Sequence, residues 1–150
     1  MEQVRYIMAT ELEMSNKETT QRIWEIIESG DLDKLSDVLA EDVVLMVPGQ
    51  DTVRGIEGYK EYIRTYDRAF PDSTVEVHDM FLDDDVVITH FTWRGTHEGE
   101  IEGIEPTGQT LELPGMTINR FEDGKAIEDI NLWDNLEFFE QLGVMEQPTS

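Results

Sequence analysis

The pattern of apolar residues changes near Pro71, and this change constrains the fold of the chain more than any other feature. Before Pro71 the apolar residues recur at the spacing of amphipathic helices, whereas after it they gather in β-rich runs separated by short turns. Helices followed by consecutive strands predict an α+β fold, in which helices cover one face of a curved, mainly antiparallel sheet. A sheet that curves against helices encloses a pocket, which is a usual setting for a small-ligand site.

The first half of the chain is predicted to be mostly helical. Ser15 followed by Glu18 has the pattern of a capping box and predicts that a helix begins there. Residues 1–14 have no clear period, and both a short helix and an arm lying on a partner subunit are compatible with them. The elements predicted in this half are helices at 15–29, 31–40 and 55–70 and a strand at 43–47.

The second half is predicted to be a series of strands that ends in a helix. Turn residues such as Asp123 and Gly124 separate the strands. Asp134 and Glu137 form a second capping-box pattern, which favours a structural role for Asp134 at the start of the last helix. The elements predicted in this half are strands at 74–81, 86–94, 110–121 and 126–133 and a helix from 134 or 135 to 142.

Charge is the feature of the composition that bears most on function. The chain carries 34 acidic and 11 basic residues, and its net charge of -23 would repel nucleic acids and anionic membranes. The acidic residues are spread over every segment, which favours adaptation of the whole surface to a salt-rich cytoplasm over an acidic interaction tail. A halophilic source is therefore inferred, and a very soluble acidic protein from an ordinary source is the alternative.

The residue types present restrict the chemistry that the protein can perform. The length of 150 residues predicts a single domain, 1–150, and the absence of cysteine excludes disulfides and thiolate chemistry. The histidines, including His90 and His97, lack a metal-binding spacing, and no glycine-rich phosphate loop follows a strand. There is also no apolar run of the length of a membrane span and no signal-peptide pattern. We therefore expect a cytoplasmic protein whose site uses no metal and no cofactor.

Five short motifs occur in order along the chain. They are Ala69-Phe70-Pro71-Asp72, Arg94-Gly95-Thr96-His97-Glu98-Gly99-Glu100, Pro106-Thr107-Gly108, Gly124-Lys125 and Gln141-Leu142-Gly143. Over residues 15–143 their order and spacing resemble the SnoaL-like polyketide cyclase family, which includes so-called ester cyclases and belongs to the nuclear-transport-factor-2-like (NTF2-like) superfamily. The resemblance implies a cone-shaped roll of helices on a curved sheet and a homodimer formed through sheet faces. It also implies ring closure by an intramolecular aldol reaction without metal or cofactor.

The chain departs from this family at both positions where the resemblance implies catalytic residues. The family's acid/base aspartate is expected twelve residues before Gly143, where this sequence has Asn131, and its histidine corresponds to Thr117. An amide does not donate or remove a proton as a carboxylic acid does, but it can form a hydrogen bond to a carbonyl or enolate oxygen.

Asp129 is the carboxylate that can take the place of the missing aspartate. If residues alternate faces along the last strand, Ile127, Asp129, Asn131 and Trp133 share one side. In a dry pocket beside Trp133 and Ile127 the charged form of Asp129 would be disfavoured, which is the usual route to a base that works near neutral pH. An exposed aspartate on an acidic protein is the alternative.

Other residues are candidates for contacts with a ligand. His90 lies inside the predicted strand 86–94, where it either points into the pocket or packs as an ordinary half-buried histidine. Tyr66 belongs to an aromatic set that could line a site for a flat apolar ligand, and a buried tyrosine hydroxyl needs a hydrogen-bond partner. We predict that Asp129 and Asn131 are catalytic and that Thr117, His90, Trp133 and Tyr66 bind the substrate.

Two functions are compatible with these features. The first is a pocket protein that binds a small, largely apolar or polyketide-like carbonyl compound and catalyses its cofactor-free cyclisation or isomerisation by acid/base chemistry. The second is a non-catalytic ligand-binding or dimeric interaction module of the same fold, which the residues Asn131 and Thr117 favour. A catalyst should hold a buried carboxylate with a raised pKa inside the pocket, whereas a binding protein need not.

Overall fold

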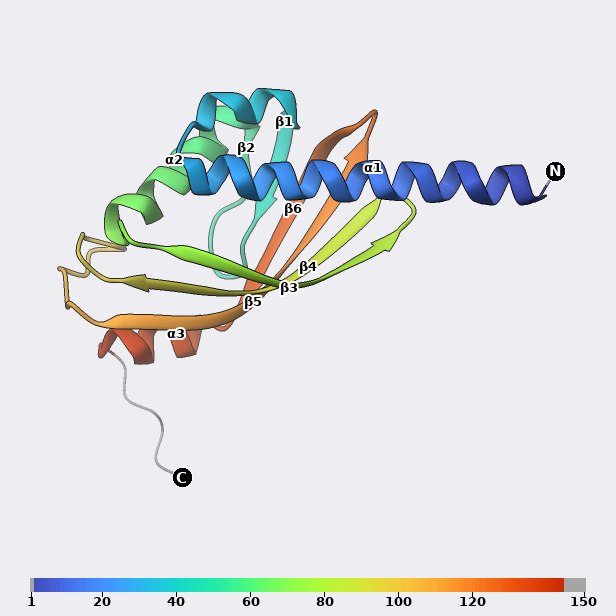
Figure 1. The fold of residues 1–150 in the computed structure, drawn as a ribbon. Coiled ribbons are helices and arrows are strands. Elements are labelled where there is room, and N and C mark those ends of the chain that lie inside the picture. The colour runs from blue at the N-terminus through green and yellow to red at the C-terminus, as the bar shows by residue number, and fades with distance from the viewer. Residues whose placement is uncertain (1, 145–150) are drawn as a thin grey trace.

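A computed structural model describes residues 2–144 of the chain, with side chains from Glu13 onward. Its elements are α1 (Glu2–Ser29), the 3₁₀ helix η1 (Leu32–Asp37), β1 (Leu39–Met46), β2 (Val53–Arg54), α2 (Gly55–Ala69), β3 (Thr74–Asp83), β4 (Val86–Thr96), β5 (Thr110–Glu122), β6 (Lys125–Trp133) and α3 (Asn135–Leu142). Figure 1 shows the strands as one curved sheet, with α1 and α2 lying across it. The predicted α+β fold is confirmed.

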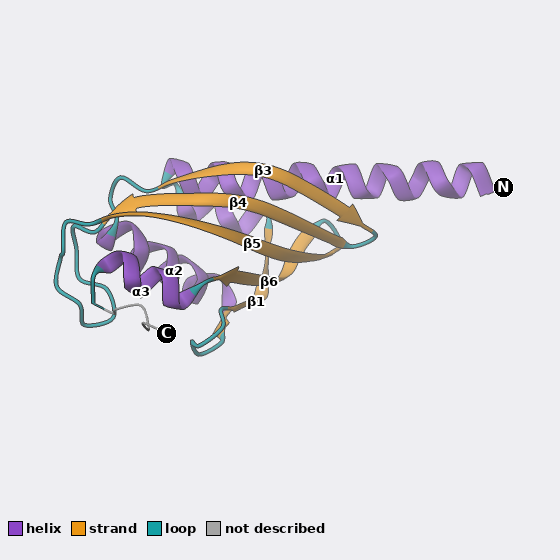
Figure 2. Ribbon diagram, turned by 90° about the horizontal axis from the view of Figure 1, so that it is seen from below, coloured by secondary structure: helices purple, strands orange, loops and turns teal. Residues whose placement is uncertain are grey.

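The sheet has six strands in the order β2-β1-β6-β5-β4-β3. Neighbouring strands run antiparallel, except that β1 pairs with β6 in parallel. The long strands β3, β4 and β5 follow one another along the chain and form the meander that the short turns predict, as Figure 2 shows. The parallel pair arises because the helical segments and the meander separate β1 from β6 in the sequence.

The two faces of the sheet differ in what covers them. Along β5, buried and exposed residues alternate strictly, so that Leu111, Leu113 and Phe121 point to the helices. Phe121 belongs to one apolar cluster with Ile23 of α1 and Ile63 of α2, whereas Leu111 and Leu113 belong to a second cluster that includes the end of α2. The inner face of the sheet is therefore its core side, and the opposite face carries no helix from the part of the chain that the structure describes.

The first helix begins earlier than the sequence predicts. α1 has 28 residues, and Ser15, the predicted start, lies in its middle, where its carbonyl oxygen accepts a hydrogen bond from Thr19 Oγ1 at 3.0 Å. The capping-box interpretation of Ser15 and Glu18 is wrong, because a helix that already includes the preceding residues leaves no free N–H groups at Ser15 to cap. Within residues 2–144 no helix, α1 included, combines the length and the apolar character that a membrane span needs.

The second predicted helix is also different in the structure. η1 is a 3₁₀ helix that ends at Asp37, and β1 begins at Leu39, whereas helix was predicted up to residue 40. Leu32 and Leu35, both buried, are three residues apart, which matches the three-residue turn of a 3₁₀ helix. At the other end of the chain the capping interpretation of Asp134 is confirmed, since its carboxylate accepts the backbone N–H of Glu137 at 3.1 Å.

The segment that follows β4 folds back onto the end of α2. The backbone N–H groups of Glu98 and Gly99 both donate to the carbonyl oxygen of Ala69, at 2.9 and 3.1 Å. A Cβ atom at Gly99 would collide with the carbonyl oxygen of Arg68, so that only glycine permits this close approach. The motif around Gly99 thus fixes the position of α2, whose side chains form one wall of the cavity described below.

Candidate functional site

A cavity of about 880 Å³ lies between the inner face of the sheet and the helices α1 and α2. Its deep part is lined by buried residues of α2, β5 and β6, whereas the end of α1 and the start of β3 contribute exposed residues and mark its mouth. All three tryptophans of the chain, Trp24, Trp93 and Trp133, belong to the lining. The predicted pocket is therefore present and is large enough for a ligand of several rings.

The deep end of the cavity carries a polar patch on β5 and β6. Asn119 and Asp129 are direct partners in the antiparallel register, as are Thr117 and Asn131 one step further along the strands. Thr117, Asn119 and Asp129 are 2%, 3% and 4% exposed, and all four residues line the cavity. Polar side chains thus stand together on a face that the rest of β5 makes apolar.

Three atoms of this patch are buried without a hydrogen-bond partner among the described residues: Thr117 Oγ1, Asn119 Nδ2 and Asp129 Oδ1. A buried polar atom that makes no hydrogen bond costs about 1–3 kcal/mol of folding free energy. A ligand with a hydrogen-bonding oxygen at this position would remove the cost. The patch therefore offers two donors and one acceptor to a molecule in the cavity.

Tyr59 of α2 holds the carboxylate of Asp129 from the opposite side. Its hydroxyl donates to Asp129 Oδ2 at 2.6 Å, and Tyr59 is itself only 3% exposed. Burial raises the pKa of Asp129 to about 6, although the hydrogen bond from Tyr59 and the nearby amide of Asn119 act in the lowering direction. Burial and the adjacent carboxylate raise the pKa of Tyr59, which keeps its hydroxyl a donor.

The middle of the cavity is aromatic. Tyr62 and Tyr66 project from α2 with ring centroids 5.0 Å apart, and Tyr66 meets the edge of Trp133 at 5.6 Å. Gln50 Nε2 donates to the hydroxyl of Tyr66 at 3.3 Å, and Trp133 Nε1 donates to Asn135 Oδ1 at 2.6 Å. Polar contacts and stacking, of Tyr66 on Phe70 and of Trp133 on Phe138, therefore fix these two aromatic residues in the cavity wall.

The structure brings together five of the six predicted site residues. Asp129, Asn131, Thr117, Trp133 and Tyr66 all line the cavity. The sequence predicted that Ile127, Asn131 and Trp133 lie on the same side of the last strand as Asp129. This holds for Asn131 and Trp133, but it is wrong for Ile127. A bulge between Arg120 and Phe121 pairs Phe121 with Ala126, so that Ala126 fills the core and Ile127 stays outside the lining.

His90 does not point into the cavity. Its neighbours in β4, Thr89 and Phe91, face the inner side and are buried, whereas His90 lies on the outer face with its Nδ1 atom 3.3 Å from Asp79 Oδ2. The prediction that His90 contacts a ligand in the cavity is wrong, because the alternation of β4 assigns it to the opposite face from Thr117.

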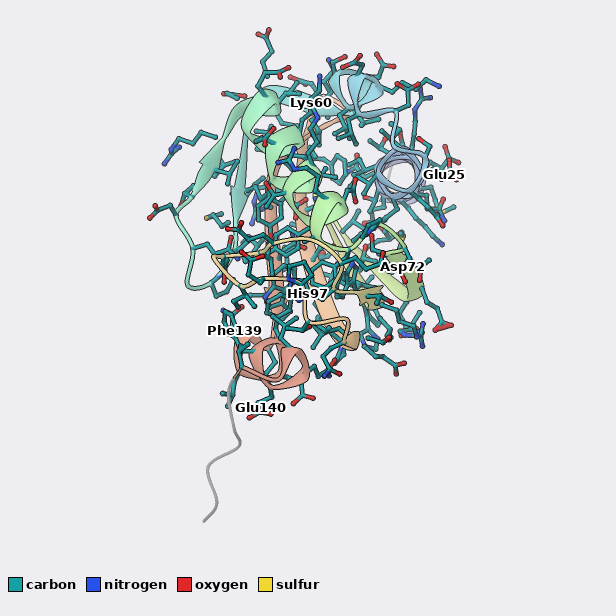
Figure 3. All side chains as sticks on the ribbon, turned by 90° about the vertical axis from the view of Figure 1, so that its left-hand side faces the viewer. Glu25, Lys60, Asp72, His97, Phe139 and Glu140 are labelled. Atoms are coloured by element: carbon teal, nitrogen blue, oxygen red, sulfur yellow. The ribbon has the colours of Figure 1, made fainter. Side chains whose placement is uncertain are left out.

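His97, although fully buried, has a structural position. Its Nδ1 atom accepts the backbone N–H of Thr107 at 3.1 Å, and its ring lies 5.4 Å from that of Phe70 (Figure 3 labels His97). His97 therefore closes the loop between β4 and β5. Across residues 2–144 no group of three or more histidine or acidic side chains is placed to hold a metal ion.

Tyr59, Tyr62 and Asn119 also line the cavity. The two tyrosines belong to the aromatic set that the sequence offered as a possible lining but were not chosen as site residues, and Asn119 was not noticed. Asn119 could have been found from the alternation of β5, because it is a polar residue at a position where the pattern calls for an apolar one. Tyr59 and Tyr62 share the helical spacing of an apolar face, which is also the pattern of ordinary core residues. Only the packing of α2 on the sheet shows which of them reach Asp129.

Comparison with known proteins gives one family. The family model described as SnoaL-like polyketide cyclase matches residues 17–142, which is most of the chain. No protein with a curated description is significantly similar to this sequence.

Solved structures of similar fold agree with the family match. A candidate SnoaL-like polyketide cyclase from Jannaschia sp. CCS1 superposes with a TM-score of 0.84 at 22% identity, covering 90% of this chain and 96% of the other. IdmH, a candidate polyketide cyclase from Streptomyces antibioticus, is 32% identical, with a TM-score of 0.74 and coverage of 86% and 99%. A third structure, of a candidate polyketide cyclase from Acidithiobacillus ferrooxidans, is 28% identical, with a TM-score of 0.74, and the match covers 86% of this chain and 94% of the other.

Proposed function

The chain belongs to the SnoaL-like polyketide cyclase family, and on this basis we propose that its cavity binds a small, largely apolar carbonyl compound and moves a proton on it without a cofactor. The observation that carries the proposal is the carboxylate of Asp129, buried in the cavity wall with Oδ1 unpartnered among the described residues. A carboxylate with a pKa of about 6 is a base near neutral pH, and its conjugate acid can return the proton.

The proposed reaction begins with a carbon–hydrogen bond next to the carbonyl group of the ligand. Asp129 Oδ1 takes this proton, and the electron pair of the broken bond forms an enolate. The developing negative charge on the enolate oxygen is stabilised by Thr117 Oγ1 and Asn119 Nδ2, two buried donors that need no reorganisation to bind it. Asn131 adds an amide next to Thr117.

The second half of the reaction decides between cyclisation and isomerisation. In a cyclisation the enolate carbon attacks a second carbonyl group of the same molecule, and the resulting alkoxide takes the proton from Asp129. In an isomerisation the proton returns to a different carbon. In both cases the carboxylate is regenerated, and the aromatic wall with Tyr66 and Trp133 holds the ligand in a dry environment.

Proton exchange on a simple ketone tests this proposal without the natural substrate. We expect the wild-type protein to accelerate exchange of the α-protons of 2-tetralone in heavy water, followed by NMR, because that ketone is apolar and enolises readily. Asp129→Asn should lose the acceleration while still binding the ketone. Asp42→Asn, an equal charge change at an exposed position on β1, is the matched control and should behave as wild type. Equal acceleration by wild type and Asp129→Asn would remove Asp129 from the mechanism.

A second candidate function, a dimeric module, is favoured by the outer face of the sheet. Phe81, Met116 and Leu132 are 57%, 40% and 39% exposed there. Met116 pairs directly with Leu132 across β5 and β6, so that apolar side chains adjoin on this face. The ion pairs of Arg94 with Glu76 and Glu112 offset part of its acidic charge, which reduces repulsion between two copies.

We therefore propose a homodimer formed through this outer face, in a salt-rich cytoplasm that suits the acidic surface. Light scattering after size exclusion should give twice the chain mass for the wild type and a monomer for Met116→Glu. Arg22→Glu, a charge reversal at an exposed position on α1, is the control. A monomeric wild type at high protein concentration and high salt would contradict the dimer and leave the cavity proposal intact.

A further inference from the structure

The charges at the mouth of the cavity are unequal in sign. The formally charged residues of the lining are Lys17, Glu25, Glu28, Asp67, Asp79 and Asp129. Lys17 is the one cation of this set, so that the described lining holds five acidic groups against one basic group. Asp129 lies at the deep end, and the carboxylate of Asp79 contacts His90 on the outer face. The acidic groups of the mouth, which a ligand passes on its way to Asp129, are therefore Glu25, Glu28 and Asp67.

Two elements supply the acidic groups of the mouth. Glu25 and Glu28 are exposed on the last turns of α1, which Figure 3 shows end-on with Glu25 labelled. Glu28 shares a helical stripe with Trp24, whose ring contacts Phe91 inside the cavity at 5.2 Å. Asp67, half-buried, comes from α2 one residue after Tyr66.

No ion pair within residues 13–144 offsets these acidic groups, although burial raises the pKa of Asp67 from its ordinary value. Among the ion pairs of residues 13–144, none involves Glu25, Glu28 or Asp67. A cleft lined by one sign of charge with low-dielectric walls concentrates its field, which attracts ligands of opposite charge and repels those of the same charge. The aromatic walls of this cavity are such a low-dielectric surface.

We infer that the cavity selects ligands by charge, accepting uncharged and cationic molecules and rejecting carboxylates, phosphates and other anions. This inference rests on the proposed function and specifies its substrate class. Two arrangements carry it: the acidic mouth formed by α1 and α2, and the buried polar patch at the deep end. Anions are disfavoured at both places, since the mouth repels them and Asp129 adds a further negative charge beside Thr117 and Asn119.

Three probes with the same apolar body and different end groups test the inference. They are 4-butylbenzylamine, 4-butylbenzyl alcohol and 4-butylbenzoate, which are cationic, neutral and anionic at neutral pH, with binding measured by isothermal titration calorimetry. At about 0.1 M salt we expect the amine and the alcohol to bind and the benzoate to bind about tenfold more weakly than the alcohol. At about 1 M salt the difference should narrow, because the screening length falls to about 3 Å.

Variants locate the origin of the selection. The double variant Glu28→Gln with Asp67→Asn should bring the affinity for the benzoate to within about threefold of that for the alcohol. Glu41→Gln with Asp42→Asn removes the same charge from exposed positions on β1 that do not line the cavity, and should leave the tenfold difference unchanged. This control separates the local field of the mouth from the effect of net charge.

The outcomes separate the inference from the proposed function. If the benzoate binds as tightly as the alcohol, or if the mouth variant keeps the full difference, charge selection by the mouth is overturned while ligand binding in the cavity stands. If none of the three probes binds, both the inference and the ligand cavity of the proposed function are overturned. If the expected order is found but Asp129→Asn still exchanges ketone protons, the charge selection stands and the proposed mechanism fails.

Discussion

At the residue scale, the cost of burying Asp129 makes the stability of the protein depend on pH. Its folded pKa of about 6 lies above its ordinary value of 3.8, so the folded state binds the proton more tightly than the unfolded state. The stabilisation from this group is therefore complete below pH 3.8 and is lost as pH rises through about 6. The loss amounts to about 3 kcal/mol at neutral pH.

Asp129→Asn should remove this dependence, because an amide carries no charge and can still accept the hydrogen bond of Tyr59. We expect the free energy of unfolding of the variant, relative to wild type, to rise by roughly 2 kcal/mol between pH 4 and pH 7. Urea unfolding at a series of pH values measures this difference. A difference that is constant over the range would show that the folded pKa of Asp129 is not raised.

We expect Tyr59 to act through Asp129, because its hydroxyl donates to Asp129 Oδ2. Because its hydrogen bond lowers the pKa of Asp129, Tyr59→Phe should raise that pKa measurably. Carbon-13 NMR of the Asp129 carboxyl measures the shift, and ketone exchange should move to higher pH in parallel. A residue with only a packing role would change stability and leave the titration of Asp129 where it is.

The sequence was enough to choose Asp129 as a site residue but not Tyr59. The first choice needs only a local sequence pattern, whereas the second needs a contact between distant parts of the chain. Asp129 follows from the alternation of one strand, which is a local pattern. Tyr59 reaches it across 70 residues of sequence, and this contact depends on how α2 lies on the sheet. The misplaced Ile127 has a similar cause, since a bulge of one residue leaves no mark in the pattern of apolar residues.

At the element scale, the fold depends on the close approach of the loop after β4 to α2. Gly99→Ala should force the loop away from Arg68 and shift α2 with Tyr59 and Tyr66. We expect the variant to lose about 1–3 kcal/mol of stability and to bind cavity ligands more weakly. Thermal unfolding and calorimetry measure the two effects, with Glu100→Ala as the exposed neighbouring control. Unchanged binding in a destabilised variant would show that the loop does not position the cavity wall.

The elements themselves were mostly predictable, and their errors are local. The strands of the meander and α3 follow from alternation and from the cap at Asp134. The start of α1 was misjudged because Ser15 has the right residue type for a cap and only the conformation of the residues before it excludes that role. The short strand β2 was missed, since two residues carry no detectable period.

At the scale of the whole molecule, the net charge of -23 opposes compaction. Raising the salt concentration from about 0.1 to 1 M shortens the screening length from about 10 to 3 Å, which mutes the repulsion between acidic groups. We expect a stabilisation of a few kcal/mol, or roughly 5–10 °C in Tm for a chain of this size. Sodium and potassium chloride should act alike if screening is the cause. A Tm that is independent of salt would contradict a surface adapted to a salt-rich environment.

The position of the tryptophans gives the molecule an optical property. Trp24, Trp93 and Trp133 are all of the tryptophans in the chain, and each lines the cavity. The tryptophan fluorescence of the protein therefore originates around the cavity, with no background emission from indoles elsewhere. Unlabelled compounds could be screened by the quenching or spectral displacement that they cause, and a conjugated ligand carried through purification would reveal itself by accepting excitation energy from these residues.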